Sequence, residues 1–214
     1  MMKFKKIFYV CIMGGIIFMS FGCNPRNNRA YLEKRIGTEM SRVYPTERLE
    51  NLFDQFPGGF KIRQSFMDGD DLFTVEIIAM RKGEPISGTV SKIGDNGSDK
   101  IFETSFQYQD GKYQFANEAD AAYWPYRGFL FEKLTLNQNI LSTLELEEKF
   151  YSMMNGDFEL RYKVTDELIN SFLGIDKSEQ LSISLEGSNG NRGYYYSIFI
   201  KNAEGLYFTE TVSD

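Results

Sequence analysis

The chain has no histidine among its 214 residues. This absence excludes Ser-His-Asp and Cys-His catalytic triads, and it removes the side chain on which most transition-metal sites depend. Basic residues are also scarce, since 24 Lys and Arg stand against 30 Asp and Glu. Nucleic acid is not a predicted partner, because phosphate binding needs clusters of Lys and Arg. A hydrolase built on carboxylates would need an acid/base spacing that the sequence does not display. The sequence therefore predicts a protein that is not an enzyme, with no catalytic residues, no cofactor and no metal.

The first 22 residues have the three parts of a bacterial export signal. Lys3, Lys5 and Lys6 form a positive start, an uncharged and mostly apolar run covers residues 7–19, and small residues then precede Cys23. This order predicts a lipoprotein signal peptide over residues 1–22, with a diacylglyceryl group on the Cys23 thiol and cleavage before it. The predicted location is the cell membrane, where the protein is lipid-anchored on the extracytoplasmic face.

Two other interpretations of this segment stay open. A retained membrane helix needs about 20 apolar residues, whereas the run over residues 7–22 is shorter and contains a Gly-Gly pair. Secretion with cleavage elsewhere would leave Cys23 as a free thiol. The segment also departs from the usual lipoprotein pattern at Ser20, where Leu is expected. We favour the lipoprotein interpretation.

Loss of the signal changes the charge and the cysteine count. It removes three lysines and no acid, so that 24 basic residues fall to 21 against 30 acidic ones, a net charge of about −9. This acidity disfavours a basic patch for anionic lipid head groups. Cys11 leaves with the signal, so an intrachain disulfide is excluded. Stability must come from the core, for which 42% hydrophobic residues suffice in one domain.

For the mature chain, the sequence predicts a short polar tether over residues 23–28 and one α+β domain over residues 29–214. Apolar spacing favours helices over 29–43 and 47–56, the second capped by Thr46. An S-x-x-E capping box at Ser142 and Glu145 predicts a helix that ends at Gly156, and Thr165 is expected to cap another over 166–173. Alternating patterns predict strands over residues 60–66, 72–80, 89–93, 100–109, 112–115, 158–164, 181–186, 193–201 and 206–212. The expected fold is a mainly antiparallel sheet with N-terminal helices and a C-terminal three-stranded meander.

One irregular segment, residues 117–133, is rich in aromatic side chains. Aromatic residues outside regular structure can line a ligand groove, and the candidate groove consists of Tyr123, Trp124, Tyr126 and Phe129. Such residues can equally close the end of a sheet as part of the core, and we favour this second interpretation because large aromatic side chains mostly serve the core.

Two further motifs resemble sites but are better explained as turns. The acidic stretch 68–71 has the start of a calcium loop, but Leu72 occupies a ligand position and the glycine comes too early. The glycine-rich stretch 187–193 follows a strand, as phosphate loops do, but it lacks the Lys-Ser/Thr ending and a following helix. A hairpin turn is the favoured interpretation of both.

Several turns and strand ends match a known pattern. A Tyr-Pro step followed by Leu-Glu-Asn-Leu-Phe-Asp lies within residues 44–54, a Gly-Asp-Phe step at 156–158, a Leu-Glu-Gly-Ser turn at 185–188, and a Leu-Tyr-Phe-Thr-Glu strand at 206–210. In these motifs the chain resembles the staphylococcal tandem lipoprotein family. The match spans most of residues 44–212 but is thin between Asp110 and Leu144, and the aromatic segment 117–133 is a departure from the pattern.

The resemblance implies a Gram-positive surface lipoprotein without established enzymatic activity, linked to immune stimulation through its lipid and to interaction with host cells. The family's lipidated cysteine falls on Cys23. Two functions therefore stay open. One is a non-catalytic surface lipoprotein, whose partners are membrane lipid and host surface or envelope proteins. The other is an extracytoplasmic binding module for a small or envelope-derived ligand.

Overall fold

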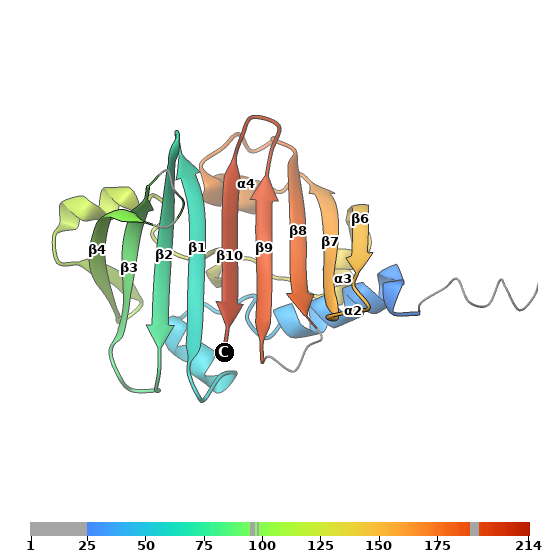
Figure 1. Cartoon of the computed structure of the whole chain (residues 1–214), viewed down its shortest axis with the longest axis horizontal. Helices are drawn as coiled ribbons and strands as arrows, with labels where there is room; N and C mark the ends of the chain where they lie inside the picture. The colour runs from blue at the N-terminus through green and yellow to red at the C-terminus, as the bar shows by residue number, and fades with distance from the viewer. Residues whose placement is uncertain (1–24, 95–96, 98, 189–192) are drawn as a thin grey trace, which may run out of the picture.

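A computed structural model of the protein describes residues 25–94, 97, 99–188 and 193–214 (Figure 1). These residues form a 10-stranded antiparallel sheet with the strand order β5-β4-β3-β2-β1-β10-β9-β8-β7-β6. The strands are β1 (Phe60–Asp68), β2 (Asp71–Ala79), β3 (Ile86–Ile93), β4 (Lys100–Gln109), β5 (Lys112–Phe115), β6 (Glu145–Tyr151), β7 (Asp157–Val164), β8 (Leu181–Ser188), β9 (Tyr195–Lys201) and β10 (Tyr207–Ser213). The helices are α2 (Arg29–Met40), α3 (Gln138–Thr143) and α4 (Glu167–Leu173), with 3₁₀ turns η1 (Pro25–Asn27), η2 (Leu49–Asp54), η3 (Glu118–Tyr123) and η4 (Leu130–Glu132).

Two five-stranded meanders meet at the centre of this sheet. Strands β1 to β5 run outward from the centre to one edge, the segment 116–144 crosses to the opposite edge, and β6 to β10 return to the centre (Figure 1). The first and last strands pair antiparallel from Lys61 and Ser213 to Phe66 and Phe208. The predicted C-terminal meander is confirmed as β8, β9 and β10, and the predicted α+β class holds in outline, since the fold is mostly β with a few short helices.

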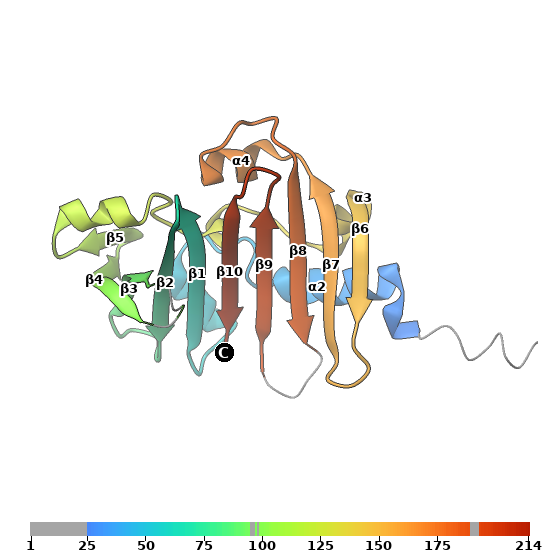
Figure 2. The same cartoon turned by 45° about the horizontal axis from the view of Figure 1, so that its top comes forward.

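The two faces of the sheet differ in what covers them. In β1, Phe60, Ile62 and Gln64 are buried while Lys61 and Arg63 between them are exposed, as expected for a strand with one face in the core. The helices and the crossing segment lie on the buried face, and no described helix covers the other face, which we call the open face (Figures 1 and 2). Among the described residues, the hydrophobic core runs from Leu32 to Val212.

Turn residues join the strands where the sequence predicts. Asp110 and Gly111, between β4 and β5, have φ angles of 53° and 76°. A two-residue hairpin of this type needs positive φ at both positions, which Asp tolerates and Gly adopts without steric cost. The turn at Asp68–Asp71 likewise joins β1 to β2.

The predicted helices are only partly confirmed. Helix α2 begins after Asn28, whose side chain accepts a hydrogen bond from the Ala30 N–H, and it ends at Met40 rather than at residue 43. The second predicted helix is the 3₁₀ turn η2, and Thr46 does not cap it, since its N-cap position is Arg48 without a side-chain bond.

Helix α4 lies within the predicted range, but the residue that caps it differs. The side chain of Asp166, not that of Thr165, accepts a hydrogen bond from the Ile169 N–H. The helix ends at Leu173, as predicted, and the left-handed Gly174 with φ 71° is its C-cap.

The predicted helix over residues 142–156 is wrong. Ser142 and Thr143 end the short helix α3, and the rest of the segment forms the edge strand β6 and a turn. Of the four apolar residues expected on the inner face of the helix, Leu146 is partly buried, whereas Phe150 is exposed at 52%, Met153 at 80% and Met154 at 99%. The register against β7 shifts between Leu146 and Glu148. Such a bulge changes which face successive side chains occupy, so the apolar spacing looked helical although the backbone is extended.

Candidate functional site

The predicted lipidation residue Cys23 lies outside the described residues, which begin two positions later. Residues 25–27, placed by the sequence in a tether, form the turn η1 against β6. Lys149 Nζ on β6 donates a hydrogen bond of 2.7 Å to the Asn27 carbonyl oxygen. No helix within the described ranges is long and apolar enough to cross a membrane.

Two residues of the candidate aromatic groove belong to the core. Trp124 and Phe129 are fully buried, with ring centroids 5.3 Å apart. The Trp124 indole also stacks on Phe106 of β4 at 5.1 Å, and its Nε1 donates a hydrogen bond of 2.7 Å to Gln64 Oε1 on β1. The sequence allowed these residues either to line a ligand groove or to belong to the core. Trp124 and Phe129 belong to the core, because neither ring is accessible to a ligand.

The other two residues of the candidate groove lie nearer the surface. Tyr126 is half-buried between Phe66 and Phe172, with ring centroids 4.9 and 5.2 Å away. Tyr123 is 42% exposed and packs against Phe102 at 4.4 Å. The four aromatic residues thus occupy core, intermediate and surface positions rather than one continuous ligand surface.

A buried carboxylate fixes the crossing segment to the centre of the sheet. Glu210 of β10 is fully buried. Its two oxygens accept four hydrogen bonds, from the N–H groups of Leu130 at 2.7 Å and Phe131 at 2.9 Å, and from Gln64 Nε2 and the Tyr44 hydroxyl at 3.1 Å each. Main-chain donors that would otherwise be unpaired in the core thereby gain an acceptor.

The environment of Glu210 changes its protonation. Burial disfavours the charged carboxylate and raises the pKa of Glu210 to about 7, although all four donors oppose this rise. The adjacent Gln64 uses its remaining donor capacity on the Gly128 carbonyl oxygen at 3.2 Å. Glu210, Gln64 and Trp124 form one connected network, and it serves the fold rather than an open pocket.

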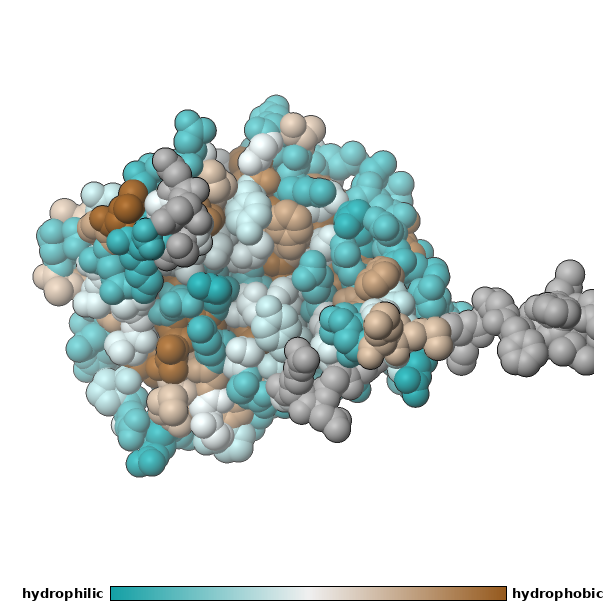
Figure 3. All heavy atoms as spheres, viewed as in Figure 1, coloured by the Kyte–Doolittle hydropathy of each residue, from teal (hydrophilic) through white to brown (hydrophobic). Residues whose placement is uncertain are grey.

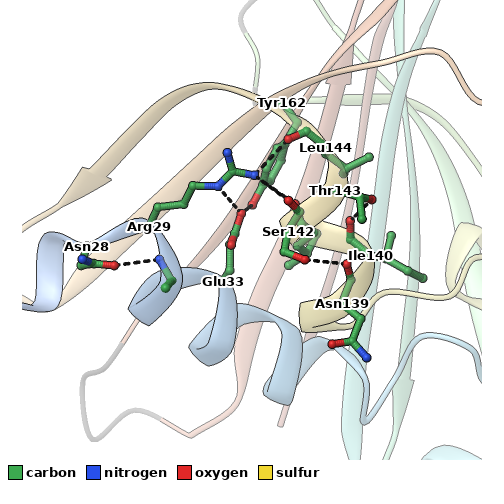
Figure 4. Close-up of polar contacts among 11 residues, drawn as sticks. Asn28, Arg29, Glu33, Asn139, Ile140, Ser142, Thr143, Leu144 and Tyr162 are labelled. Atoms are coloured by element: carbon green, nitrogen blue, oxygen red, sulfur yellow. Dashed lines mark hydrogen bonds and ion pairs between the residues drawn. The ribbon is translucent and has the colours of Figure 1, made fainter.

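A second buried acid joins α2 to the sheet and to α3 (Figure 4). Glu33 of α2 is 3% exposed, and it accepts hydrogen bonds from Arg29 Nε at 2.6 Å and from the Tyr162 hydroxyl at 3.3 Å. The Arg29 guanidinium also donates to the carbonyl oxygens of Ser142 at 3.2 Å and Leu144 at 3.0 Å. A cation at these carbonyls satisfies groups that a helix end leaves unpaired, so Arg29 holds α3 in place.

Helix α3 forms one wall of an apolar cavity of about 270 Å³ on the helical face of the sheet. The floor is formed by aliphatic residues of β7, β8 and β9, and α4 supplies the opposite wall. Eleven of the fifteen lining residues are Leu, Ile or Val, and the others are Lys133, Thr135, Tyr162 and Asp166. The cavity can therefore take an apolar group, with polar atoms at few points.

The open face carries a larger hollow of about 590 Å³ with an acidic lining. Figure 3 shows this face as mostly hydrophilic with scattered apolar side chains. Glu159 of β7 and Glu186 of β8 are directly opposite each other in the sheet, and burial together with Glu159 raises the pKa of Glu186. Arg161 offsets the repulsion by donating a hydrogen bond of 2.7 Å to Glu159. Ser188 and Gly193 line the hollow, and the residues between them in the sequence lie outside the described part.

The two motifs explained as turns are placed only in part, and Gly187, Ser188 and Gly193 of the glycine-rich stretch line the hollow on the open face. The acidic stretch 68–71 is the β1–β2 hairpin. The glycine-rich stretch begins at the end of β8, and its residues 189–192 lie outside the described chain. In the part of the chain that the structure describes, no three His, Cys, Asp or Glu side chains gather in a group that could hold a metal ion.

The sequence predicted neither the apolar cavity nor the acidic hollow on the open face. The apolar cavity combines residues of α3, α4 and three strands, and α3 lies in a region where no helix was predicted before residue 142. The alternation over residues 158–164 predicts a strand, of which Tyr162 and Val164 line the cavity. The empty space above this strand depends on how α3 and α4 pack, and no local sequence pattern predicts that packing.

A scan of the chain against models of protein families finds no match, and a search of curated proteins finds no similar sequence.

Proposed function

We propose that the protein is a lipid-anchored, non-catalytic protein of the extracytoplasmic face of the cell membrane, joined to lipid through diacylglyceryl-Cys23. Its folded part contacts host or envelope components, and the lipid supports immune stimulation. The observation that carries the proposal is the order of charged, apolar and small residues before Cys23. The resemblance to the staphylococcal tandem lipoproteins points in the same direction and stays a prediction.

Two features of the fold support this proposal. The 3₁₀ turn η1, which follows Cys23 closely in the sequence, packs against the edge strand β6, where Lys149 Nζ donates a hydrogen bond to the Asn27 carbonyl oxygen, so the folded part would begin close to the anchor. The buried acids Glu33 and Glu210 are hydrogen-bonded within the fold, an arrangement that serves structure and leaves neither carboxylate for acid/base chemistry on a substrate.

Replacement of Cys23 by alanine tests the anchor. We expect the C23A protein to leave the membrane fraction and to incorporate no labelled fatty acid, because stable attachment needs two acyl chains and both are joined to this thiol. Cells expressing the wild type, C23A and the matched control C11A are fractionated after a high-salt wash. C11A should behave like the wild type. Retention of C23A in the membrane, with no label on the wild type, would contradict the proposal.

A second candidate function is an extracytoplasmic binding module. The apolar cavity between α3 and α4 favours it, since ligand sites are concave, mostly apolar and equipped with few polar groups. The cavity replaces the aromatic segment 117–133 as the proposed location, because Trp124 and Phe129 are buried. A ligand that prefers the folded state must raise the melting temperature of residues 24–214, and a panel of envelope fragments and amphiphiles without such a shift would contradict this function.

A further inference from the structure

We propose that the apolar cavity binds a single-chain anionic amphiphile, a fatty acid of medium chain length, with its tail on the sheet between α3 and α4 and its carboxylate at Lys133. This inference rests on the second candidate function, the binding module, and names its ligand class. It does not depend on lipidation of Cys23.

The volume of the cavity fits one alkyl chain. Protein interiors are close-packed, and voids larger than a water molecule are few. The cavity measures about 270 Å³. At about 30 Å³ per group, the share of one water in the liquid and close to that of a methylene, such a space holds roughly nine groups. A diacyl lipid is too large for it. A chain of about eight to ten carbons fits with its head outside, and a chain of about twelve carbons extends to the exposed rim.

The lining of the cavity suits a flexible aliphatic tail. Its floor includes Leu185 of β8 and Ile198 of β9, both almost completely buried. Its rim includes Ile140 of α3 and Leu168 of α4, which are 36% and 41% exposed. Aliphatic side chains exposed on both sides of an opening extend the apolar path to solvent, so a tail would gain contacts at the rim as well as inside.

The charges at the cavity select the sign of the head group. Lys133 and Asp166 are the two charged residues of the lining. Asp166 already accepts the Ile169 N–H at 2.9 Å as the cap of α4. The ammonium of Lys133 lies 5.6 Å from the Phe172 ring centroid, on an exposed side chain that can meet a carboxylate at the mouth. A charge-assisted hydrogen bond then fixes the head while the tail is buried.

Calorimetric titration of residues 24–214 with dodecanoate, below its micelle concentration, tests the inference. We expect saturable 1:1 binding, with dodecyltrimethylammonium at least about tenfold weaker because its head repels Lys133. Acetate, which lacks a tail, should not bind. Equal or tighter binding of the cationic amphiphile would overturn the fatty-acid assignment but leave the binding module in place.

Variants of the cavity and its mouth locate the binding. I183F places a larger side chain over the floor and should weaken dodecanoate by about tenfold or more, while the melting temperature stays within a few degrees of the wild type. K133Q leaves the cavity intact and should weaken dodecanoate by about tenfold, and the matched control K112Q on the distant strand β5 should change nothing. If I183F fails to fold, K133Q against K112Q decides the question.

The outcomes separate this inference from the other proposals. Dodecanoate binding that neither I183F nor K133Q weakens would overturn the cavity as the site. If no amphiphile of either charge binds, both the fatty-acid assignment and the use of this cavity by a binding module are overturned. Fatty-acid labelling of Cys23 is measured separately, so the anchor proposal stands or fails without reference to the titration.

Discussion

Glu210 determines the conformation of a stretch of chain that lies eighty residues earlier in the sequence. Its carboxylate accepts the N–H groups of Leu130 and Phe131 inside the core. A buried N–H without an acceptor costs free energy comparable to a lost hydrogen bond, so the irregular segment can cross the sheet at this position because Glu210 is there. The residue is structural, although a buried carboxyl group is also typical of catalytic sites.

The raised pKa of Glu210 makes the stability of the fold depend on pH. The folded-state pKa of about 7 exceeds the value of 4.5 for an unperturbed Glu. Between these values the native state binds more protons than the unfolded state, so the free energy of unfolding falls as pH rises through this window. At about 1.4 kcal/mol per pKa unit, we expect the wild type to lose about 3 kcal/mol between pH 4.5 and pH 7.5 through this group. Urea unfolding at several pH values measures the loss.

The variant E210Q isolates this contribution. Its amide does not titrate, so its free energy of unfolding should vary less with pH than that of the wild type. Its stability should be lower at pH 5, because the amide N–H₂ faces donors in place of an acceptor. The matched control E84Q changes an exposed residue and should reproduce the pH dependence of the wild type. Equal pH slopes for E210Q and the wild type would contradict the assignment.

Part of this network could be predicted from single residues. Glu210 lies between Phe208 and Val212 in an alternating strand, and Gln64 lies between Ile62 and Phe66, so the period of two places both polar side chains on the buried face. Such positions indicate a polar side chain that must find a partner in the core. The partners themselves could not be predicted, because they come from a segment without periodicity and far away in the sequence.

At the scale of elements, strands were predicted better than helices. Central strands such as β2 and β9 consist of alternating or continuous apolar residues that match their burial. The error at β6 concerns an edge strand, where only one side has a partner and burial constrains the pattern weakly. Glu145 to Tyr151 are mostly exposed, so their sequence lacks the alternation of apolar and polar residues that indicates a strand. The capping box and the apolar spacing therefore favoured a helix.

Trp124 tests whether the crossing segment is an integral part of the core. We expect W124A to lose about 3–5 kcal/mol in the free energy of unfolding, because a fully buried indole is removed and Gln64 loses its donor partner. Fluorescence of the wild type, whose only tryptophan this is, should be quenched weakly by acrylamide.

The matched control is Y123A, one residue earlier and 42% exposed. It should cost less than about 1 kcal/mol, as is usual for exposed positions. Ready quenching of Trp124, together with a loss as small as that of Y123A, would mean that the segment detaches from the sheet in solution.

At the scale of the whole molecule, the two five-stranded meanders are joined into one sheet by a single pair of strands, β1 and β10. β1 belongs to the N-terminal meander and β10 to the C-terminal one, and their pairing makes a single sheet of them. This connection has a high sequence separation and could not be predicted from local signals, because either strand could also have been an edge. The sequence predicts the meanders and leaves their order in space open.

A chain that ends at Gly205 lacks β10 and tests this dependence. We expect it to show no cooperative unfolding, since β1 and β9 each lose a partner and the Leu130 and Phe131 N–H groups lose their acceptor. The control chain ends at Ser213 and keeps all of β10, so it should unfold cooperatively. Thermal unfolding followed by near- and far-UV circular dichroism compares the two. A cooperative transition in the shorter chain would show that the halves fold independently.

The attachment of η1 to β6 has a consequence for how the proposed lipoprotein stands on a membrane. Pro25 follows Cys23 by two positions, and covalent geometry limits this span to about 7 Å. With lipid on Cys23, the β6 edge is held at the height of the head groups. The sheet has ten strands, and at about 4.8 Å per spacing its opposite edge reaches as far as about 43 Å from β6. β5 is then the part of the protein that can extend farthest above the bilayer, where an approaching partner would meet it first.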